Sequence, residues 1–383
     1  MKKFMEKVSI LSLSLVLTTA FSVSSAQSAM FAFYKDLPES WVELLVSLPS
    51  AGIMLMLLLN GRVEKYLSER QMIVAGLLIF SLCGFVPLLN QDYWVIFASR
   101  FIFGMGVGLL NAKAISIISE RYRGKERIQT LGLRGSAEVV GTALLTLGVS
   151  QLLRFGWEVA FLVYASGLIV LALYLLFVPY GKEEKQHKTH QAGRRLTASQ
   201  WFLTIGLAFV AAVIVLSNVV INLRVPGIVE KSGMGSVQTA GLILSAMQLI
   251  GIVAGLSFSP LLHHFKENLL TLAGVVFGLT LIMIGLAPNL FLLSMTTIAA
   301  GFAYNISLIA IFHILSERIP SKSLNQATSI AILGCSSGAT STTFVLSLIG
   351  NFSSQASFIF GILGALMVLI AVLAFSIVKK TAV

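Results

Sequence analysis

The chain has 383 residues, of which 56% are hydrophobic and 11% are charged. Soluble domains carry about 25% charged residues, and a folded chain must cover its water-facing surface partly with polar side chains. The composition therefore excludes a soluble globular protein, and the net charge of +11 must be explained by where it lies along the chain.

Hydrophobic runs of about 20 residues are long enough to cross roughly 30 Å of hydrocarbon as a helix. The sequence predicts twelve such helices and no strands, because the alternation typical of membrane β-barrels is absent. In chain order the predicted helices cover residues 8–33, 41–59, 72–89, 94–119, 128–153, 157–178, 201–223, 239–258, 269–286, 290–315, 327–349 and 356–378.

The longest polar stretch divides these helices six and six. It is highly charged and has no apolar periodicity, as is typical of a solvated linker. We predict a six-helix bundle at residues 1–180, a cytoplasmic linker at 181–199 and a second six-helix bundle at 200–383.

The positive charge follows the alternation of the predicted loops. Of the 27 lysines and arginines, twenty lie in segments on the same side as the two termini and only four in segments on the other side. Cytoplasmic loops carry this excess, so we expect both termini in the cytoplasm and the chain in the cell membrane. The charge then marks topology and contacts anionic lipid, with no nucleic acid as partner.

The first 30 residues allow a second interpretation. A basic start, an apolar core and small residues at 24–29 resemble a cleavable signal peptide. Removing them would leave eleven helices and break the six-plus-six division, so we predict an uncleaved first helix.

An internal repeat aligns the two halves at an offset of 197 to 198 residues. Ser119-Glu120-Arg121 matches Ser316-Glu317-Arg318, and Gly141 matches Gly338. Six is an even number, so both halves enter the membrane from the same side and the repeat is parallel. Two such bundles build a transporter whose binding site lies between them near the middle of the bilayer.

These features resemble the major facilitator superfamily over essentially the whole chain. The loop after the second helix resembles that family's cytoplasmic signature, and the fourth helix, with Arg100 followed by Gly104 and Gly108, resembles its arginine–glycine motif. The resemblance implies a secondary transporter and a cytoplasmic gate in the signature loop. The residues that carry the gate are Gly61, Glu64, Lys65 and Arg70.

Four charged residues lie away from the ends of their helices, where a charge costs roughly 2.5–3.5 kcal/mol to insert. Arg134 and Glu138 are four residues apart and can pair. Lys113 of the preceding antiparallel helix lies at a similar depth. We predict a Lys113–Arg134–Glu138 cluster with Glu138 as the candidate proton carrier; the alternative is a structural ion pair.

Arg100 is the fourth of these charges, and it shares a helix face with Asn111. It could contact an anionic substrate, or it could be a buried arginine satisfied by backbone carbonyls. By resemblance to the family, the seventh and tenth helices also face the cavity. The candidates for hydrogen bonds to substrate are Asn111, Asn218, Asn222 and Asn305, and the alternative role for each is contact between helices.

The sequence thus predicts a monomeric secondary transporter that is driven by protons and exports amphipathic organic compounds. The alternative is uptake or exchange of a small organic anion, which the excess of buried cations favours. A remote third possibility is an intramembrane enzyme that modifies lipids; it would require clustered nucleophiles, and the predicted helices hold one histidine and no aspartate. No cofactor or metal is expected, because Cys83 and Cys335 lie alone in apolar runs.

Overall fold

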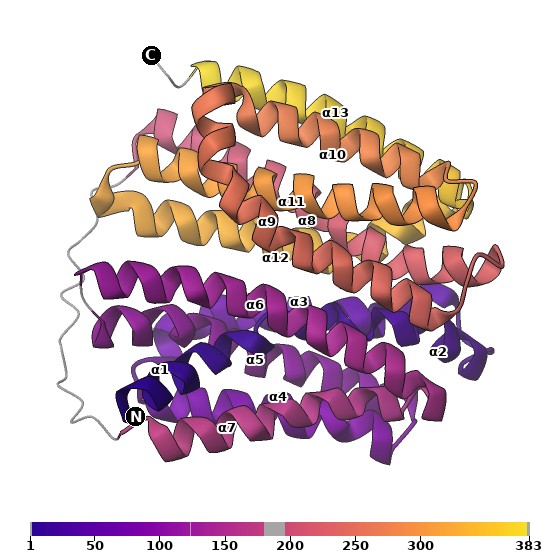
Figure 1. The fold of residues 1–383 in the computed structure, drawn as a ribbon, viewed down its shortest axis with the longest axis horizontal. Helices are drawn as coiled ribbons and strands as arrows, with labels where there is room; N and C mark the ends of the chain where they lie inside the picture. The colour runs from indigo at the N-terminus through magenta and orange to yellow at the C-terminus, as the bar shows by residue number, and fades with distance from the viewer. Residues whose placement is uncertain (1, 123, 180–195, 381–383) are drawn as a thin grey trace. The chain divides into compact units, whose positions relative to one another are not determined.

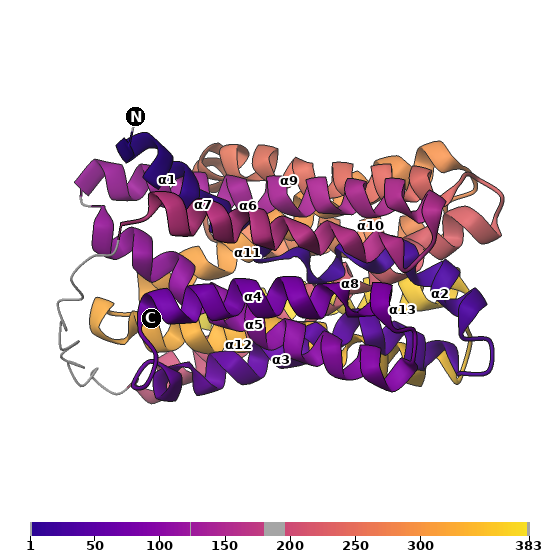
Figure 2. The ribbon, with the colours of Figure 1, turned by 90° about the horizontal axis from the view of Figure 1, so that it is seen from below.

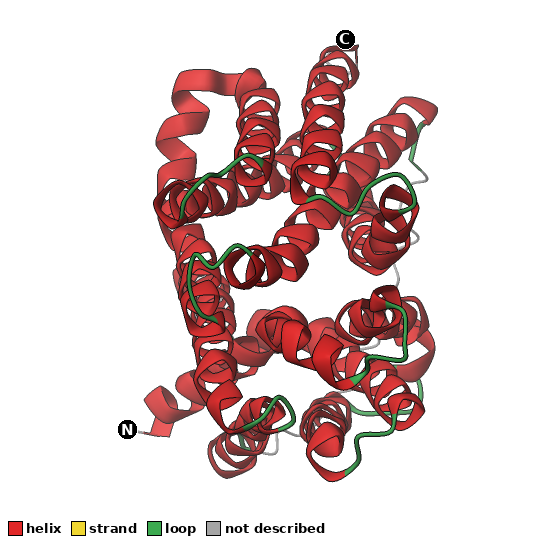
Figure 3. Cartoon of the chain, turned by 90° about the vertical axis from the view of Figure 1, so that its right-hand side faces the viewer, coloured by secondary structure: helices red, strands yellow, loops and turns green. Residues whose placement is uncertain are grey.

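The computed structural model describes residues 2–122, 124–179 and 196–380. These residues fold almost entirely into helices joined by short loops, and Figure 3 shows no strand among them. An all-helical fold follows from the composition, because a helix satisfies its own backbone hydrogen bonds inside lipid.

The helices before the linker include four 3₁₀ segments. In order they are α1 (Lys2–Ser12), η1 (Leu13–Val16), η2 (Thr19–Ala26), α2 (Gln27–Phe33), α3 (Glu39–Val63), α4 (Glu69–Leu89), α5 (Tyr93–Arg121), α6 (Gly124–Leu152), η3 (Leu153–Phe155), η4 (Val159–Ala165) and α7 (Ser166–Phe177).

The helices after the linker are longer and include one 3₁₀ segment (Figure 1). They are α8 (Ala198–Lys231), α9 (Val237–Phe265), η5 (Lys266–Asn268), α10 (Leu269–Gly285), α11 (Leu290–Arg318), α12 (Ser321–Gly350) and α13 (Ala356–Lys380).

Ten helical runs among the described residues are long and apolar enough to cross a membrane, and the bent pair at the start of the chain raises the number to eleven. One of these runs, Val237–Gly285, has 49 residues and contains both α9 and α10. The number of helices therefore agrees approximately with the twelve that the sequence predicts, and the all-α membrane fold is confirmed.

The described chain forms two compact units. Unit 1 comprises Met1–Pro179 and Asn222–Leu249, and unit 2 comprises Tyr180–Ile221 and Ile250–Val383. The hairpin at 222–249, made of the end of α8 and the start of α9, thus belongs to unit 1 although it follows the linker. Most of the predicted linker lies outside the described residues, and α8 begins within its last two positions.

The first membrane segment is bent by 49°, where the sequence predicted one continuous helix. Its hydroxyl side chains bond back to their own backbone: Ser12 Oγ donates to Ser9 O at 2.8 Å and Thr19 Oγ1 to Val16 O at 2.9 Å. Such bonds compete with helical hydrogen bonds and bend helices. The segment between these residues is consequently 3₁₀ helix on either side of a break at Leu17 and Thr18.

Close packing in unit 1 depends on small residues. Figure 2 shows α5 lying between α3 and α4. A Cβ atom added at Gly104 of α5 would collide with the backbone of Pro49 in α3, and one added at Gly52 of α3 would collide with the backbone of Phe101. Small residues let membrane helices approach this closely, which explains the glycine run in α5.

Unit 2 repeats a packing feature of unit 1. In unit 1, Gly141 of α6 lies against the backbone of Leu15 in the first segment. In unit 2, Gly338 of α12 lies against the backbone of Ala212 in α8. The residues of the two contacts are related by the same offset of 197, so the repeat that is visible in the sequence also relates contacts within the units.

An aromatic cluster lies at the end of unit 1 where α2 meets α3. Tyr34 packs edge-on against Phe33 and Tyr93, and Trp41 packs against Tyr93 and Trp94. The Tyr34 hydroxyl donates to Gln91 O at 2.6 Å, and burial raises the pKa of Tyr34 to about 12, so it remains a donor. Tyrosine and tryptophan gather at membrane–water interfaces, which places this end of unit 1 at one boundary of the bilayer.

Candidate functional site

Arg100 is completely buried in unit 1. Its Nε donates to Leu45 O at 3.1 Å, and its Nη2 donates to Ala20 O at 3.0 Å, just beyond the break in the first segment. Its guanidinium lies 4.6 Å from the ring centre of Phe103 and 5.5 Å from that of Tyr164. Carbonyl dipoles and aromatic faces thus stabilise this charge, an arrangement that favours the structural alternative for Arg100.

Tyr164 supports the same break. Its hydroxyl donates to Thr19 O at 3.3 Å. Two neighbouring carbonyls of the first segment, those of Thr19 and Ala20, therefore receive hydrogen bonds from side chains of η4 and α5. Side-chain donors of this kind allow a broken helix to persist inside lipid.

Lys113 forms an ion pair with Glu64 at the end of α3, with 2.9 Å between Nζ and Oε1. Asn60 Nδ2 also donates to Glu64, at 3.0 Å. These contacts tie the signature loop to α5. The structure thus brings Lys113 to a residue predicted for the gate, while Arg134 and Glu138 form their own pair.

The other residues of the signature loop differ in their surroundings. Arg70 Nη1 donates to Val178 O at 3.3 Å and its guanidinium lies 6.0 Å from the ring centre of Tyr174, so it joins α4 to the end of α7. Lys65 is exposed. Gly61 lies within α3, and a Cβ atom added there would meet nothing within 4 Å.

Arg134 and Glu138 pair along α6 as their spacing predicts, with 3.4 Å between Nη2 and Oε2. The next turn of α6 meets the break in the first segment. Thr142 Oγ1 donates to Glu138 O at 2.9 Å and lies 2.5 Å from Thr18 Oγ1. Glu138 is therefore one helical turn from residues that contact the broken segment.

The four asparagines lie in different surroundings. Asn218 and Asn222 are buried in α8, while Asn111 of α5 is half-buried. Asn305 donates to Gly301 O at 2.8 Å in its own helix and lies against Gly251 of α9. That contact is helix packing of the kind expected for a small–polar interface.

Glu43 forms an ion pair that the sequence did not predict. It lies one turn into α3 with its side chain 2% exposed, and its Oε1 is 2.8 Å from Arg224 Nη2 of α8. A second pair, Glu39 with Lys231, lies one turn of α3 nearer the aromatic end at 3.8 Å. All four residues belong to unit 1. The sequence did contain a signal for the Glu43–Arg224 pair, because these opposite charges lie at the same-side ends of the second and seventh predicted helices.

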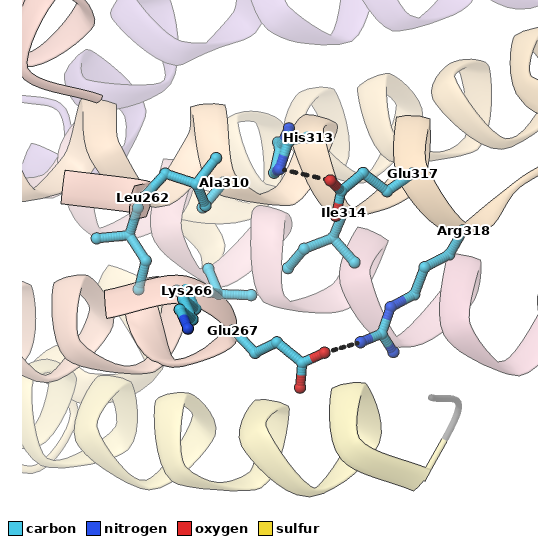
Figure 4. A pocket seen from close by; sticks show the side chains of 10 residues that line it. Leu262, Lys266, Glu267, Ala310, His313, Ile314, Glu317 and Arg318 are labelled. Carbon is cyan, nitrogen blue, oxygen red and sulfur yellow. Dashed lines mark hydrogen bonds and ion pairs between the residues drawn. The ribbon is translucent and has the colours of Figure 1, made fainter. Parts of the chain in front are cut away.

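Unit 2 contains a separate pocket of about 260 Å³ where α9, α10 and α11 end or begin. Figure 4 shows two pairs of polar side chains in it: His313 Nε2 lies 3.3 Å from Glu317 Oε1, and Arg318 Nη2 lies 3.4 Å from Glu267 Oε1. No group of three or more possible metal-ligating side chains occurs among the described residues.

Two units of long apolar helices, with charged side chains buried among them, define a polytopic membrane protein. The sequence model of the Major Facilitator Superfamily matches residues 4–284, which is most of the chain. The chain therefore belongs to this superfamily, and it is a transporter and not an enzyme.

Two relatives of named function have low sequence identity. The chain is 23% identical over 335 residues to the chloramphenicol resistance protein CraA of Acinetobacter baumannii, covering 80% of this chain and 78% of that protein. It is 23% identical over 137 residues to the riboflavin transporter RibZ of Clostridioides difficile, covering 35% of this chain and 30% of that protein.

Solved structures support the fold. A crystal structure of a D-xylose–proton symporter superposes with a TM-score of 0.79 at 18% identity, and the match covers 98% of this chain and 97% of the other. At this identity the similarity concerns the fold alone.

Proposed function

We propose that the protein is a secondary active transporter that moves a small organic solute across the cytoplasmic membrane by alternating access. The bundles are residues 1–180 and 200–383, joined by the linker at 181–199, with both termini in the cytoplasm. Lysines and arginines on the terminal side support this orientation. Monomeric function is the simplest form, since a single chain holds both halves of the repeat.

The coupling ion is a proton, and Glu138 carries it. The observation that supports this assignment is the place of the Arg134–Glu138 pair, one turn from the Thr142–Thr18 contact with the broken first segment. Protonation of Glu138 removes its attraction to Arg134, so the two protonation states favour different arrangements of α6 against that segment. Broken helices and charged residues inside the membrane are typical of transport sites.

For the direction and the substrate, we prefer export of amphipathic organic compounds over uptake of a small organic anion. The relative named for chloramphenicol resistance supports it, because the similarity extends over 80% of the chain. Uptake or exchange of a small organic anion is the second candidate, because the predicted helices hold three cations, Arg100, Lys113 and Arg134, and one acid, Glu138.

The test is flux in proteoliposomes with an imposed pH gradient. Chloramphenicol, riboflavin and a set of small organic anions serve as probes. We expect the gradient to drive net flux of at least one probe in the wild type. The variant Glu138→Gln should bind that probe and exchange it without a gradient, but the gradient should no longer drive net flux.

The matched control is Glu230→Gln, which neutralises an exposed carboxylate near the end of α8. It should retain gradient-driven flux. If Glu138→Gln kept full gradient-driven flux, the assignment of the proton carrier would be wrong and the ion pair would be structural.

A further inference from the structure

The first membrane segment holds a row of buried polar side chains that form no hydrogen bond with any described group of the protein. They are the hydroxyls of Ser22, Ser24 and Ser25 in η2 and both polar atoms of Gln27, the first residue of α2. Each of these four residues is at most 2% exposed. Buried polar groups are nearly always hydrogen-bonded, because an unpaired one keeps the full cost of leaving water. The row therefore requires a partner from outside the described chain.

The backbone carbonyls that these hydroxyls would use are already occupied. A serine in a helix usually bonds the carbonyl three or four residues before it. The Ala20 carbonyl, four residues before Ser24, accepts from Arg100 Nη2 at 3.0 Å. The neighbouring carbonyl, that of Thr19, accepts from the Tyr164 hydroxyl at 3.3 Å. Donors from α5 and η4 thus compete with the serines for the backbone of η2.

The 3₁₀ form of η2 stacks the unpaired side chains in two pairs. Residues three apart in a 3₁₀ helix eclipse one another, with a rise of about 2.0 Å per residue. Ser22 and Ser25 therefore lie about 6 Å apart along the axis, as do Ser24 and Gln27. The backbone N–H of Gln27 donates to Ser24 O, as this register requires. One bridging water spans nearly the same length through two hydrogen bonds of about 2.8 Å each.

The mixture of donors and acceptors indicates which partner fits the row. Gln27 leaves both its Nε2, which only donates, and its Oε1, which only accepts, without a hydrogen bond. A metal cation cannot bind the donor, and an anion cannot bind the acceptor. Water does both, and a buried water typically makes about three hydrogen bonds to polar groups of this kind.

The row begins beside the candidate proton carrier. η2 follows directly after Thr18, whose hydroxyl contacts that of Thr142 in α6. Thr142 donates to Glu138 O at 2.9 Å, so Thr18 must donate to Thr142, and its oxygen can still accept from water. Glu138 lies on the same face of α6 one turn away, about 5.4 Å along the axis. At the other end of the row, Gln27 opens α2, which runs to the aromatic cluster at the bilayer boundary.

We propose that water molecules bound along η2 pass protons between Glu138 and the bilayer boundary opposite the chain termini. Each water accepts a proton from one neighbour and releases another to the next, so one proton is transferred and every oxygen keeps its bonds. The route rests on the proposed function, in which Glu138 binds the proton. Ser22, Ser24, Ser25 and Gln27 are positioning residues, because they hold the waters in place.

The charge of Arg100 has a defined effect on this route. Its guanidinium lies beside η2, where Nη2 donates to Ala20 O at 3.0 Å. Like charges repel, so an excess proton is less stable on the waters of η2 than on a carboxylate. The waters therefore conduct the proton, and Glu138 is the group that retains it.

Radiolytic hydroxyl labelling of the purified full-length protein detects water beside buried side chains. Tyr164 is the probe, because it is completely buried and its hydroxyl lies 3.3 Å from the backbone of η2. Phe360 of α13 in unit 2 is equally buried and serves as the reference. Tyr164 should be labelled severalfold faster than Phe360, and the double variant Ser22→Ala/Ser25→Ala should remove most of the difference.

The thermal unfolding midpoint of the double variant is a second readout. If the hydroxyls were dry, Ser22→Ala/Ser25→Ala would raise the midpoint, because it removes buried groups that have no partner. If they bind water, the midpoint should stay the same or fall. Ser99→Ala is the matched control, since Ser99 is also buried but donates to Ile96 O at 2.7 Å. It should leave the labelling of Tyr164 unchanged.

Flux in proteoliposomes tests the proton route itself. The variant Ser22→Ala/Ser25→Ala should lose most of its gradient-driven flux, while its exchange without a gradient remains at the wild-type rate. Ser99→Ala should retain both. In a Glu138→Gln background the two serine substitutions should have no further effect, because the group that receives the proton is already absent.

Tyr164 labelling that is no faster than that of Phe360, or that is unchanged in the double variant, would overturn the hydration of η2, as would a raised midpoint. Full gradient-driven flux in the double variant, with the labelling lost, would overturn the route. No gradient-driven flux in the wild type would contradict the proposed function and the route with it. Labelling and the midpoint do not depend on transport, so they would still decide whether water binds along η2.

Discussion

Arg100 and Glu138 show two ways in which this chain keeps a charge inside the membrane. Arg100 donates to two carbonyls and lies against aromatic rings, while Glu138 pairs with Arg134 along its own helix. The first arrangement is fully buried and fixed by three other elements. The second lies on one helix face and can change with a single proton.

Arg100 therefore should act on stability more than on substrate affinity. Arg100→Ala removes two hydrogen bonds from a cationic donor, and we expect it to lower the free energy of unfolding in detergent by about 2–3 kcal/mol. Arg100→Lys should recover only part of this loss, because one ammonium cannot reproduce the planar fork that reaches Leu45 O and Ala20 O. Thermal unfolding of the purified variants is the measurement.

Arg154→Ala is the control, since that arginine is exposed in η3, and it should leave the unfolding midpoint unchanged. An Arg100→Ala variant with wild-type stability and a severalfold higher KM for an anionic probe would instead make Arg100 a substrate contact.

At the scale of elements, the first membrane segment and α6 form the most informative contact. Gly141 lies directly against the backbone of Leu15, and Thr142 contacts Thr18 at the break. Because the atoms facing Gly141 are backbone, they cannot move aside as a flexible side chain would. This contact fixes the distance between the broken segment and the turn of α6 that carries Glu138.

Two glycines of α6 should consequently respond to alanine in opposite directions. Gly141→Ala should destabilise the protein, because its Cβ collides with backbone atoms of Leu15. Gly135→Ala meets nothing within 4 Å and should stabilise the helix by about 0.5–1 kcal/mol through its better helix propensity. Unfolding in detergent measures both. Equal effects of the two substitutions would show that Gly141 is not in close contact.

The sequence predicted the elements better than their irregularities. Hydropathy and loop charge depend on runs of many residues, so the helical class and the approximate helix number were accessible from them. The bend at Leu17–Thr18 was not, because it depends on hydroxyls bonding their own backbone and on donors from Arg100 and Tyr164, which are distant in sequence. The pairing of Lys113 with Glu64 was not predicted for a related reason: depth along a helix does not specify which face of α5 meets the end of α3.

For the whole molecule, the internal repeat is the feature that appears both in the sequence and in the contacts of the structure. The offset of 197 relates Gly141–Leu15 to Gly338–Ala212, and it also shows where the halves diverge, as at Glu6 and Leu203. The ion pair between Glu43 and Arg224 follows no such relation in the sequence, since it joins residues from the two sides of the linker within unit 1.

Transport by alternating access requires the hairpin at 222–249 to separate from α3 during the cycle. Glu43–Arg224 and Glu39–Lys231 hold this hairpin against α3 within unit 1. If residues 200–383 act as one bundle during transport, these contacts must part once in every cycle. A link that prevents their separation should stop the cycle without preventing folding.

The most direct measurement is therefore flux through a reversibly cross-linked protein. In a background with Cys83→Ala and Cys335→Ala, the pair Glu39→Cys and Lys231→Cys puts one thiol at each of two positions whose longer native side chains pair at 3.8 Å, and the reagent spans the remaining gap between the shorter cysteines. A short, reducible bifunctional thiol reagent should abolish flux in the double variant, reduction should restore it, and each single cysteine should be unaffected. Undiminished flux with the cross-link fully formed would contradict the account.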